Sequence, residues 1–188
     1  MKRDFFAGST VKAARKLLGK YLVRNYKGKI LAAKIVETEA YTGGRDPGSH
    51  AYSGRTPRNE VMFGPPGFAY VYFCYGNHFL LNIVTEKEGA AGAILIRAAE
   101  PVSGIKTMMK LRGCGELLKL TNGPGKLTRA MAVDKSFNRA DMAGGEELYA
   151  ASGGDEKFTV TKGPRIGIKK GLEFNRRFCI KGSRFLSV

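Results

Sequence analysis

Hydrophobic residues recur along the chain at two spacings. A spacing of two predicts strands, and a spacing of three or four predicts helices. Segments rich in aromatic and β-branched residues and bounded by Gly or Asn are typical of strands. The predicted strands are 21–26, 29–36, 68–75, 79–84, 93–98, 157–161 and 178–181. Apolar residues spaced three and four apart behind Ser-Thr or Gly-Pro-Gly are typical of helices. The predicted helices are 11–18, 105–111 and 127–133.

Short turns join several of these segments, and one long stretch has no period. Turns at 27–28 (Lys-Gly) and 76–78 (Gly-Asn-His) each separate two predicted strands and indicate two hairpins. Residues 42–67 hold Gly, Pro, Ser, Arg and Asn, which predicts a long loop of the kind that often carries function. We find no repeat and no linker. We therefore predict one compact α+β domain over 1–188, a mostly antiparallel curved β-sheet with surrounding helices and a protruding β-hairpin.

The chain is strongly basic, and its charge is unevenly placed. It has 188 residues, with 32 Lys and Arg against 16 Asp and Glu, a formal net charge of +16. Its 43% hydrophobic content supports a packed core and excludes a disordered basic tail. The excess of positive charge lies in 1–60 and 101–188, whereas 61–100 is nearly neutral. A folded domain of this charge is typical of nucleic-acid binding, with an anionic membrane surface or a basic assembly as alternatives.

Composition also bears on location and cofactors. No apolar run approaches the ~18–20 residues that a membrane span needs, and the first residues lack the apolar region of a signal peptide. Cys74, Cys114 and Cys179 are widely spaced without a CxxC pair, and the chain has two histidines. We therefore expect a cytoplasmic protein, nucleoid-associated if bacterial, with no metal, no cofactor and no membrane partner.

One strand-like stretch carries candidate chemistry. In an extended chain Glu37, Glu39 and Tyr41 share one face, which places two carboxylates and a phenol just before the long loop. Glutamates at a strand end more often pair with lysines, so the pattern alone is a weak indication of catalysis.

The aromatic run 68–75 is the second stretch. Tyrosine rings stack on bases, and their hydroxyls suit a solvated edge. A β-rich core is the simpler explanation for Phe68, Tyr70 and Phe73. Tyr75 adjoins the predicted turn and is instead expected at an exposed hairpin tip.

These stretches belong to a longer ordered set of motifs. The set is Glu37-Thr-Glu-Ala-Tyr41, His50, Arg55-Thr-Pro-Arg-Asn59, Met62-Phe63, Tyr70-Val-Tyr72, Tyr75-Gly76, Asn82-Ile83, Arg97-Ala-Ala-Glu-Pro101, Gly123-Pro-Gly-Lys-Leu127 and Lys135-Ser-Phe137. In this order it resembles the alkyladenine (3-methyladenine) DNA glycosylase family, over about 4–188. The resemblance implies a monofunctional hydrolase that starts base excision repair. Such an enzyme flips damaged purines out of double-stranded DNA and hydrolyses their N-glycosidic bonds with an activated water.

The resemblance also implies roles for matching residues. Glu39 is the implied general base, and Arg97 is implied to position the attacking water and to anchor Glu39. Tyr75 is the implied wedge that fills the gap left in the duplex by the flipped nucleotide. The implied phosphate contacts are Arg55, Arg58, Lys126 and Arg129.

Four more residues form the implied base pocket. Tyr41 and Tyr72 sandwich the base, and His50 lies on the opposite side of the stack and at the ring edge. Tyrosine faces attract a cationic alkylated purine more than a neutral normal one. Asn82 opposes the exocyclic amine of guanine and so rejects that base.

Three questions stay open at this stage. The preferred lesion is one of 3-methyladenine, other alkylated purines, hypoxanthine and ethenoadenine. A non-catalytic nucleic-acid binder has the same use for basic flanks and an aromatic centre. An enzyme of another class on a similar scaffold, such as a tRNA or formyl-group transferase relative, is the remaining alternative. We expect the protein to act on DNA as a monomer.

Overall fold

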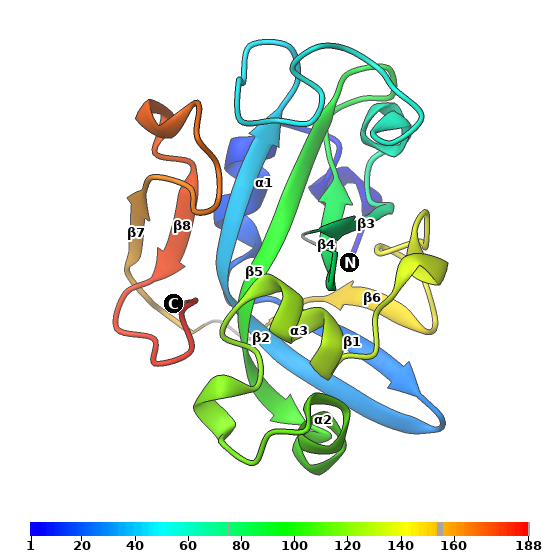
Figure 1. Ribbon diagram of the computed structural model, residues 1–188, viewed down its shortest axis with the longest axis vertical. Helices are drawn as coiled ribbons and strands as arrows, with labels where there is room; N and C mark the ends of the chain where they lie inside the picture. The colour runs from blue at the N-terminus through cyan, green and yellow to red at the C-terminus, as the bar shows by residue number, and fades with distance from the viewer. Residues whose placement is uncertain (75, 154–155, 188) are drawn as a thin grey trace.

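Two long antiparallel strands form the spine of the structure. In the computed structural model, β2 (Lys29–Thr42) pairs with β5 (Gly92–Ser103) along nearly the whole length of both strands (Figure 1). The residues that the structure describes are 1–74, 76–153 and 156–187. Because both strands carry side chains on alternate faces, this spine presents residues far apart in sequence to the same side of the sheet.

The other strands add to both edges of the spine. They are β1 (Tyr21–Tyr26), β3 (Ala69–Cys74), β4 (His78–Val84), β6 (Leu148–Ala151), β7 (Val160–Gly163) and β8 (Arg177–Ile180). The main path of the sheet runs β3-β4-β5-β2-β1-β6, and β8 pairs with β2 and carries β7 on its outer edge. Every one of these pairings is antiparallel, which confirms the predicted α+β fold with a curved antiparallel sheet.

β2 changes partner at its centre. Its first part pairs with β1, and Glu37–Glu39 pair with β8. The register against β5 shifts at Ile35–Glu37 and again at Glu37–Thr38. Such bulges bend a strand and increase its twist, so the second half of β2 is redirected and continues to Thr42.

Helices cover the sheet. They are α1 (Thr10–Leu17), α2 (Ile105–Arg112) and α3 (Pro124–Ala130), with 3-10 turns at Arg3–Phe5, Glu60–Phe63, Leu117–Lys119, Lys135–Phe137 and Leu172–Phe174. The Ser9 side chain caps α1 by accepting a hydrogen bond from the Lys12 amide. Ala13, Ala14 and Leu17 of α1 are buried, while Lys12 faces solvent, as the spacing of apolar residues predicts.

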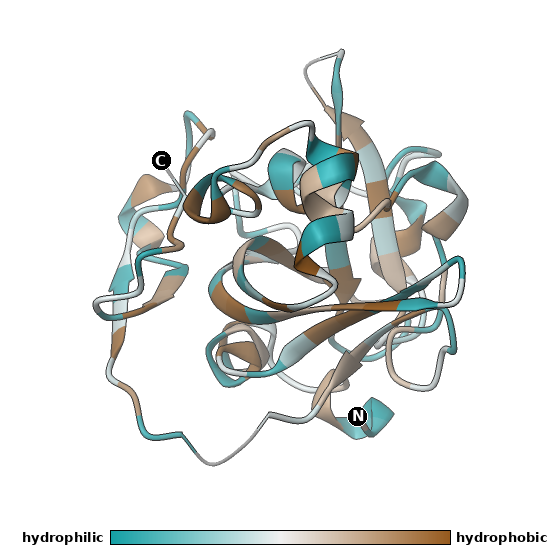
Figure 2. Ribbon diagram, turned by 90° about the horizontal axis from the view of Figure 1, so that it is seen from below, coloured by the Kyte–Doolittle hydropathy of each residue, from teal (hydrophilic) through white to brown (hydrophobic). Residues whose placement is uncertain are grey.

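One principal hydrophobic core lies between the sheet and these helices. Figure 2 shows hydrophobic residues gathered along the strands, with hydrophilic residues on the loops and the outer helix turns. The largest fully buried side chains of this core include Phe6, Leu17, Leu22, Leu31, Ile35, Leu81, Ile83, Ile94, Ile96 and Met108. No helix among the described residues is long and apolar enough to cross a bilayer.

Several predicted boundaries were wrong. The strand predicted at 29–36 continues to Thr42, and the one predicted at 93–98 spans Gly92–Ser103, because the two strands pair from Ala32 with Ser103 to Thr42 with Gly92. The helix predicted at 127–133 begins at Pro124, since a proline is well suited to the first helical turn, and ends at Ala130. The strand predicted at 157–161 lies at Val160–Gly163, and Leu148–Ala151 was not predicted as a strand.

The β3–β4 hairpin protrudes from the body, as predicted. Phe73 is 51% exposed, so the core explanation was wrong for this residue, and Asn77 and His78 are exposed as well. Phe73 instead packs against Phe79 across the hairpin, with ring centroids 5.0 Å apart. The predicted tip residue Tyr75 lies outside the residues that the structure describes.

Candidate active site

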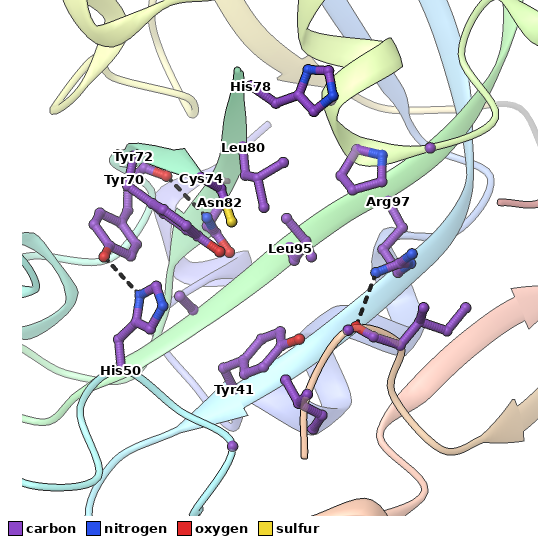
Figure 3. A pocket seen from close by; sticks show the side chains of 18 of the residues that line it. Tyr41, His50, Tyr70, Tyr72, Cys74, His78, Leu80, Asn82, Leu95 and Arg97 are labelled. Carbon is purple, nitrogen blue, oxygen red and sulfur yellow. Dashed lines mark hydrogen bonds between the residues drawn. The ribbon is translucent and has the colours of Figure 1, made fainter. Parts of the chain in front are cut away.

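A cavity of about 390 Å³ opens where the spine, the hairpin, α3 and the chain after β7 meet. Figure 3 shows side chains from β2, β3, β4 and β5 turned toward this space. The described residues that line it are Tyr41, Gly48, His50, Met62, Tyr70, Tyr72, Cys74, His78, Leu80, Asn82, Ala93, Leu95, Arg97, Asn122, Gly123, Pro124, Gly125, Lys126, Ile166, Gly167 and Ile168. Its size suits a small aromatic ligand.

Aromatic rings form one side of the cavity. The Tyr72 ring lies 5.1 Å from that of Tyr70 and 4.7 Å, edge to face, from that of His50 (Figure 3). His50 Nδ1 and the Tyr70 hydroxyl are hydrogen-bonded at 3.0 Å. Asn59 holds the loop in place by donating to the His50 carbonyl at 2.7 Å. Burial, helped by the Arg58 cation, lowers the pKa of His50, which favours the neutral ring at neutral pH.

Tyr41 lies across the cavity from Tyr72 (Figure 3). Its hydroxyl donates to Glu39 Oε2 at 2.7 Å, which confirms that these two residues share a face of β2. Burial, together with the adjacent Glu39 carboxylate, raises the pKa of Tyr41, so this phenol stays protonated and remains a donor.

Glu39 lies behind the cavity wall and has no exposed side-chain surface. Its carboxylate accepts hydrogen bonds from Tyr41, from the Ile166 amide at 2.7 Å and from Arg97 Nη1 at 3.5 Å. Burial raises the pKa of Glu39, although Arg97 and the Tyr41 hydrogen bond oppose that rise. A carboxylate held in this way is a stronger base than one in water.

Glu37 shares Arg97 with Glu39, but its other partners lie near the C-terminus. Arg97 Nε and Arg177 Nη1 lie 3.3 and 3.2 Å from Glu37 Oε1, and the Ser187 amide donates to Oε2 at 2.6 Å. Glu37 is thus tied to the C-terminal segment, and it does not line the cavity. Arg97 bridges the two carboxylates and also reaches the cavity surface.

Asn82 is 4% exposed and contributes to the cavity wall from β4. Its amide nitrogen donates to the Tyr70 carbonyl at 3.1 Å, which fixes the orientation of the amide. The sites predicted as Glu39, Arg97, Tyr41, His50, Tyr72 and Asn82 therefore come together, five on the cavity surface and Glu39 directly behind it.

The four residues predicted to contact phosphates lie in different positions relative to the cavity. Lys126 lines the cavity and donates to Asn122 at 3.0 Å. Arg58 lies 5.6 Å over the Tyr72 ring, and Arg55 lies 5.3 Å over that of Phe63. The remaining residue, Arg129, does not line the cavity, and its Nε donates to the Leu111 carbonyl.

A buried ion pair beside the cavity was not predicted from the sequence. Arg165 donates to both carboxylate oxygens of Asp46 at 2.6 and 2.7 Å, and both side chains are fully buried. The Arg165 guanidinium lies 4.6 Å from the centre of the Tyr41 ring. The only signal was an arginine within Gly-Pro-Arg-Ile-Gly at 163–167, which indicates a turn but not its partner.

No three His, Cys, Asp or Glu side chains in the described part of the chain are grouped as ligands of a metal ion. The reactive groups are instead the guanidinium, phenols and neutral His50 imidazole of the cavity and the buried Glu39 carboxylate behind it. This set can stack a planar base, move a proton to a carboxylate and stabilise developing positive charge.

Comparisons with known proteins agree with the resemblance seen in the sequence. A family model described as methylpurine-DNA glycosylase matches residues 4–184. Relatives from Carboxydothermus hydrogenoformans and Rhodopseudomonas palustris are 48% and 47% identical over the whole chain, covering 98% and 87% of their own lengths. A relative from Chlorobium phaeobacteroides is 45% identical over 98% of the chain and 93% of its own length. Each is named "Putative 3-methyladenine DNA glycosylase". The chain therefore belongs to the methylpurine-DNA glycosylase family.

Proposed function

We propose that this chain, a DNA glycosylase by family, flips alkylated purines out of double-stranded DNA and hydrolyses their N-glycosidic bonds. The primary substrate class is 3-methyladenine and related alkylated purines, the base named for its relatives. The observation that carries the proposal is the aromatic cavity between Tyr41 and Tyr72, with the buried Glu39 carboxylate directly behind it.

The position of the cavity between strands of the sheet supports base flipping. A base stacked inside a duplex cannot reach a pocket walled by four strands, so the nucleotide must leave the helix. Unstacking costs a few kcal/mol and costs least for a damaged base. Tyr75 is our proposed wedge for the vacated position, although it lies outside the described residues.

The aromatic walls support selection of alkylated bases. A purine between Tyr41 and Tyr72 stacks on both faces, with His50 at its edge. Alkylation at a ring nitrogen gives the base a positive charge, and tyrosine faces attract cations by about 0.5–2 kcal/mol. Asn82, held by Tyr70, is the proposed group that rejects the exocyclic amine of guanine.

Glu39 is the proposed general base. The oxygen of a water molecule bonds to C1′ as the C1′–N bond breaks, and the electron pair leaves with the base. Glu39 takes the proton from that water and its charge stabilises the oxocarbenium-like transition state. Arg97, which lines the cavity and contacts Glu39, is proposed to hold the water at this carboxylate.

In this proposal, basic residues at the surface bind the DNA backbone. The +16 charge attracts the phosphate backbone whatever the base sequence, and Arg55, Arg58, Lys126 and Arg129 are the proposed contacts. Selectivity comes from the cavity. We propose that the chain acts on DNA as a monomer, with the cavity residues and Glu39 supplied by the same copy.

A panel of lesion duplexes tests the proposed function. Duplexes with one hypoxanthine or one ethenoadenine are incubated with the protein and treated with alkali, and release of 3-methyladenine is followed from alkylated DNA. Base release from at least one of these substrates, with none from an undamaged duplex, is expected. Tight binding with no release from any of them would instead favour the non-catalytic binder, which would also bind RNA in competition with DNA.

A further inference from the structure

One buried arginine ties the chain after β7 to the active site. Arg165 is 3% exposed and donates to three separate segments. Nη1 donates to the Ala40 carbonyl of β2 at 3.0 Å, and Nη2 donates to the Gly171 carbonyl at 3.1 Å. The same two nitrogens clamp Asp46 in the loop that follows β2. The planar fork of an arginine suits this arrangement, which a lysine cannot reproduce.

Two glycines leave room for this guanidinium. A Cβ added at Gly48 would lie 2.8 Å from Arg165 Nη2, and one added at Gly171 would lie at the same distance. Real Cβ atoms essentially never make contacts this short, so a side chain at either position would force Arg165 or the atoms beside it to move. The chain is thus shaped around Arg165.

Arg165 reaches the active site by two routes. Its guanidinium lies 4.6 Å from the centre of the Tyr41 ring but does not line the cavity, so it supports the ring from the far side. The next residue, Ile166, donates its amide to Glu39 Oε1 at 2.7 Å. The position of Arg165 therefore affects a stacking surface and a hydrogen bond to the carboxylate together.

We propose that Arg165, through its ion pair with Asp46, is a positioning residue of the glycosylase reaction that sets the Tyr41 ring and the Ile166 amide against Glu39. The inference rests on the proposed function. It assigns Arg165 no contact with substrate. Its effect on rate comes from the alignment of the groups that do make contact, and small misalignments in such sites lower rates strongly.

Arg176 provides a matched control. Its Nη1 lies 3.1 Å from Asp46 Oδ2 and donates to Thr42 Oγ1 at 2.9 Å. Arg176 therefore pairs with the same buried carboxylate as Arg165. Its guanidinium packs 4.3 Å over the Phe174 ring, whereas that of Arg165 packs over Tyr41. Loss of Arg176 therefore perturbs the same ion cluster without removing the support of Tyr41.

The experiment compares Arg165→Met, Arg165→Lys and Arg176→Met with the wild-type protein. Thermal melting reports folding, lesion-duplex binding reports DNA affinity, and single-turnover base release is measured across a pH range. We expect Arg165→Met to lower the rate constant about tenfold or more, and Arg176→Met less than about threefold. Duplex binding changes little in both. Arg165→Lys keeps the positive charge but lacks the planar guanidinium, so its rate constant should lie between those of Arg165→Met and the wild-type protein.

The pH profile separates positioning from general destabilisation. The titratable and charged groups around Glu39 come from several elements. They are Tyr41 and Glu37 of β2, Tyr72 of β3, Arg97 of β5, Cys179 of β8 and Arg165 itself, and the Ile166 amide donates to the carboxylate. If Arg165 no longer holds Tyr41 and Ile166, the ionised carboxylate loses two donors and the acid limb moves to higher pH. Arg176→Met leaves that limb where the wild type has it.

Three results would overturn the proposal. One is an equal loss of rate in Arg165→Met and Arg176→Met. Another is a wild-type rate and pH profile in Arg165→Lys, which would mean that a positive charge alone suffices. If Arg165→Met does not fold, Arg165→Lys alone tests the proposal. The third is a rate loss in Arg165→Met with an unmoved acid limb. Absence of base release by the wild-type protein would contradict the proposed function itself.

Discussion

The Tyr41 hydroxyl donates a hydrogen bond of 2.7 Å to the Glu39 carboxylate. Tyr41 therefore has two functions in our account: its ring stacks on the purine, and its hydroxyl orients the general base. The two functions are separable by substitution, because phenylalanine keeps the ring and removes only the donor.

Tyr41→Phe should lower the rate of base release more than the affinity for a lesion. A hydrogen bond to a charged group contributes about 1.5–3 kcal/mol, so the rate constant at pH 7 should fall about tenfold or more. The ionised form of Glu39 loses a donor, and the acid limb should move to higher pH. Single-turnover kinetics against pH measure both effects. Tyr21→Phe, on β1, is the control, and an equal fall there would contradict the assignment.

Glu39→Gln should make the protein more stable at neutral pH. Burial raises the pKa of Glu39 above its usual 4.5, so the buried charge destabilises the folded state once the carboxyl ionises. The wild-type protein therefore has its full stability at low pH, where Glu39 is protonated, and loses part of it as the pH rises through the folded-state pKa of Glu39. Urea unfolding should show Glu39→Gln more stable than the wild-type protein at pH 7, with the difference becoming small at about pH 4. A less stable variant at pH 7 would contradict this reasoning.

Asn82→Ala should relax discrimination against the guanine amine. Asn82 is nearly buried in the cavity wall, and its loss both enlarges the pocket and removes the group proposed to oppose that amine. The ratio of 7-methylguanine release to hypoxanthine release should rise about tenfold. Asn122→Ala, which also alters a cavity-lining asparagine, should leave the ratio near the wild-type value. A similar rise in both variants would remove Asn82 from its proposed role.

Lys126→Ala should weaken duplex binding, with a smaller effect for Arg129→Ala. Lys126 is at the cavity, whereas Arg129 donates to the Leu111 carbonyl and does not line it. Loss of one phosphate contact lowers the slope of log K against log salt by about 1. Fluorescence anisotropy over a salt series measures that slope. An unchanged slope in Lys126→Ala would show that this lysine does not touch the backbone.

Local sequence patterns predicted the elements that depend on local interactions. The Ser9 cap, the apolar face of α1 and the turns at 27–28 and 76–78 are set by neighbouring residues, and each prediction was confirmed in outline. Boundaries that depend on distant partners were not predictable in this way. β2 continues to Thr42 because β8 pairs with it at Glu37–Glu39 and β5 pairs with it as far as Thr42. Leu148–Ala151 becomes a strand only against β1.

The residues of the candidate site also differ in whether local sequence could predict their placement. Glu39 and Tyr41 are two residues apart, so the period of an extended chain places both on one face. The gathering of His50, Tyr72 and Arg97 around them was available only through the family resemblance, which the comparisons confirm. Asp46 and Arg165 are 119 residues apart, and no periodicity relates them.

The activity of Glu39→Gln tests the central claim most directly. The variant keeps the shape of the side chain and removes its capacity to accept a proton. Glu116→Gln, an exposed residue paired with Lys119, is the matched control. On a lesion that the wild-type protein excises, our account predicts that Glu39→Gln binds the duplex normally and releases base about 10²–10⁴-fold more slowly, with Glu116→Gln unchanged. Wild-type turnover by Glu39→Gln would contradict the account.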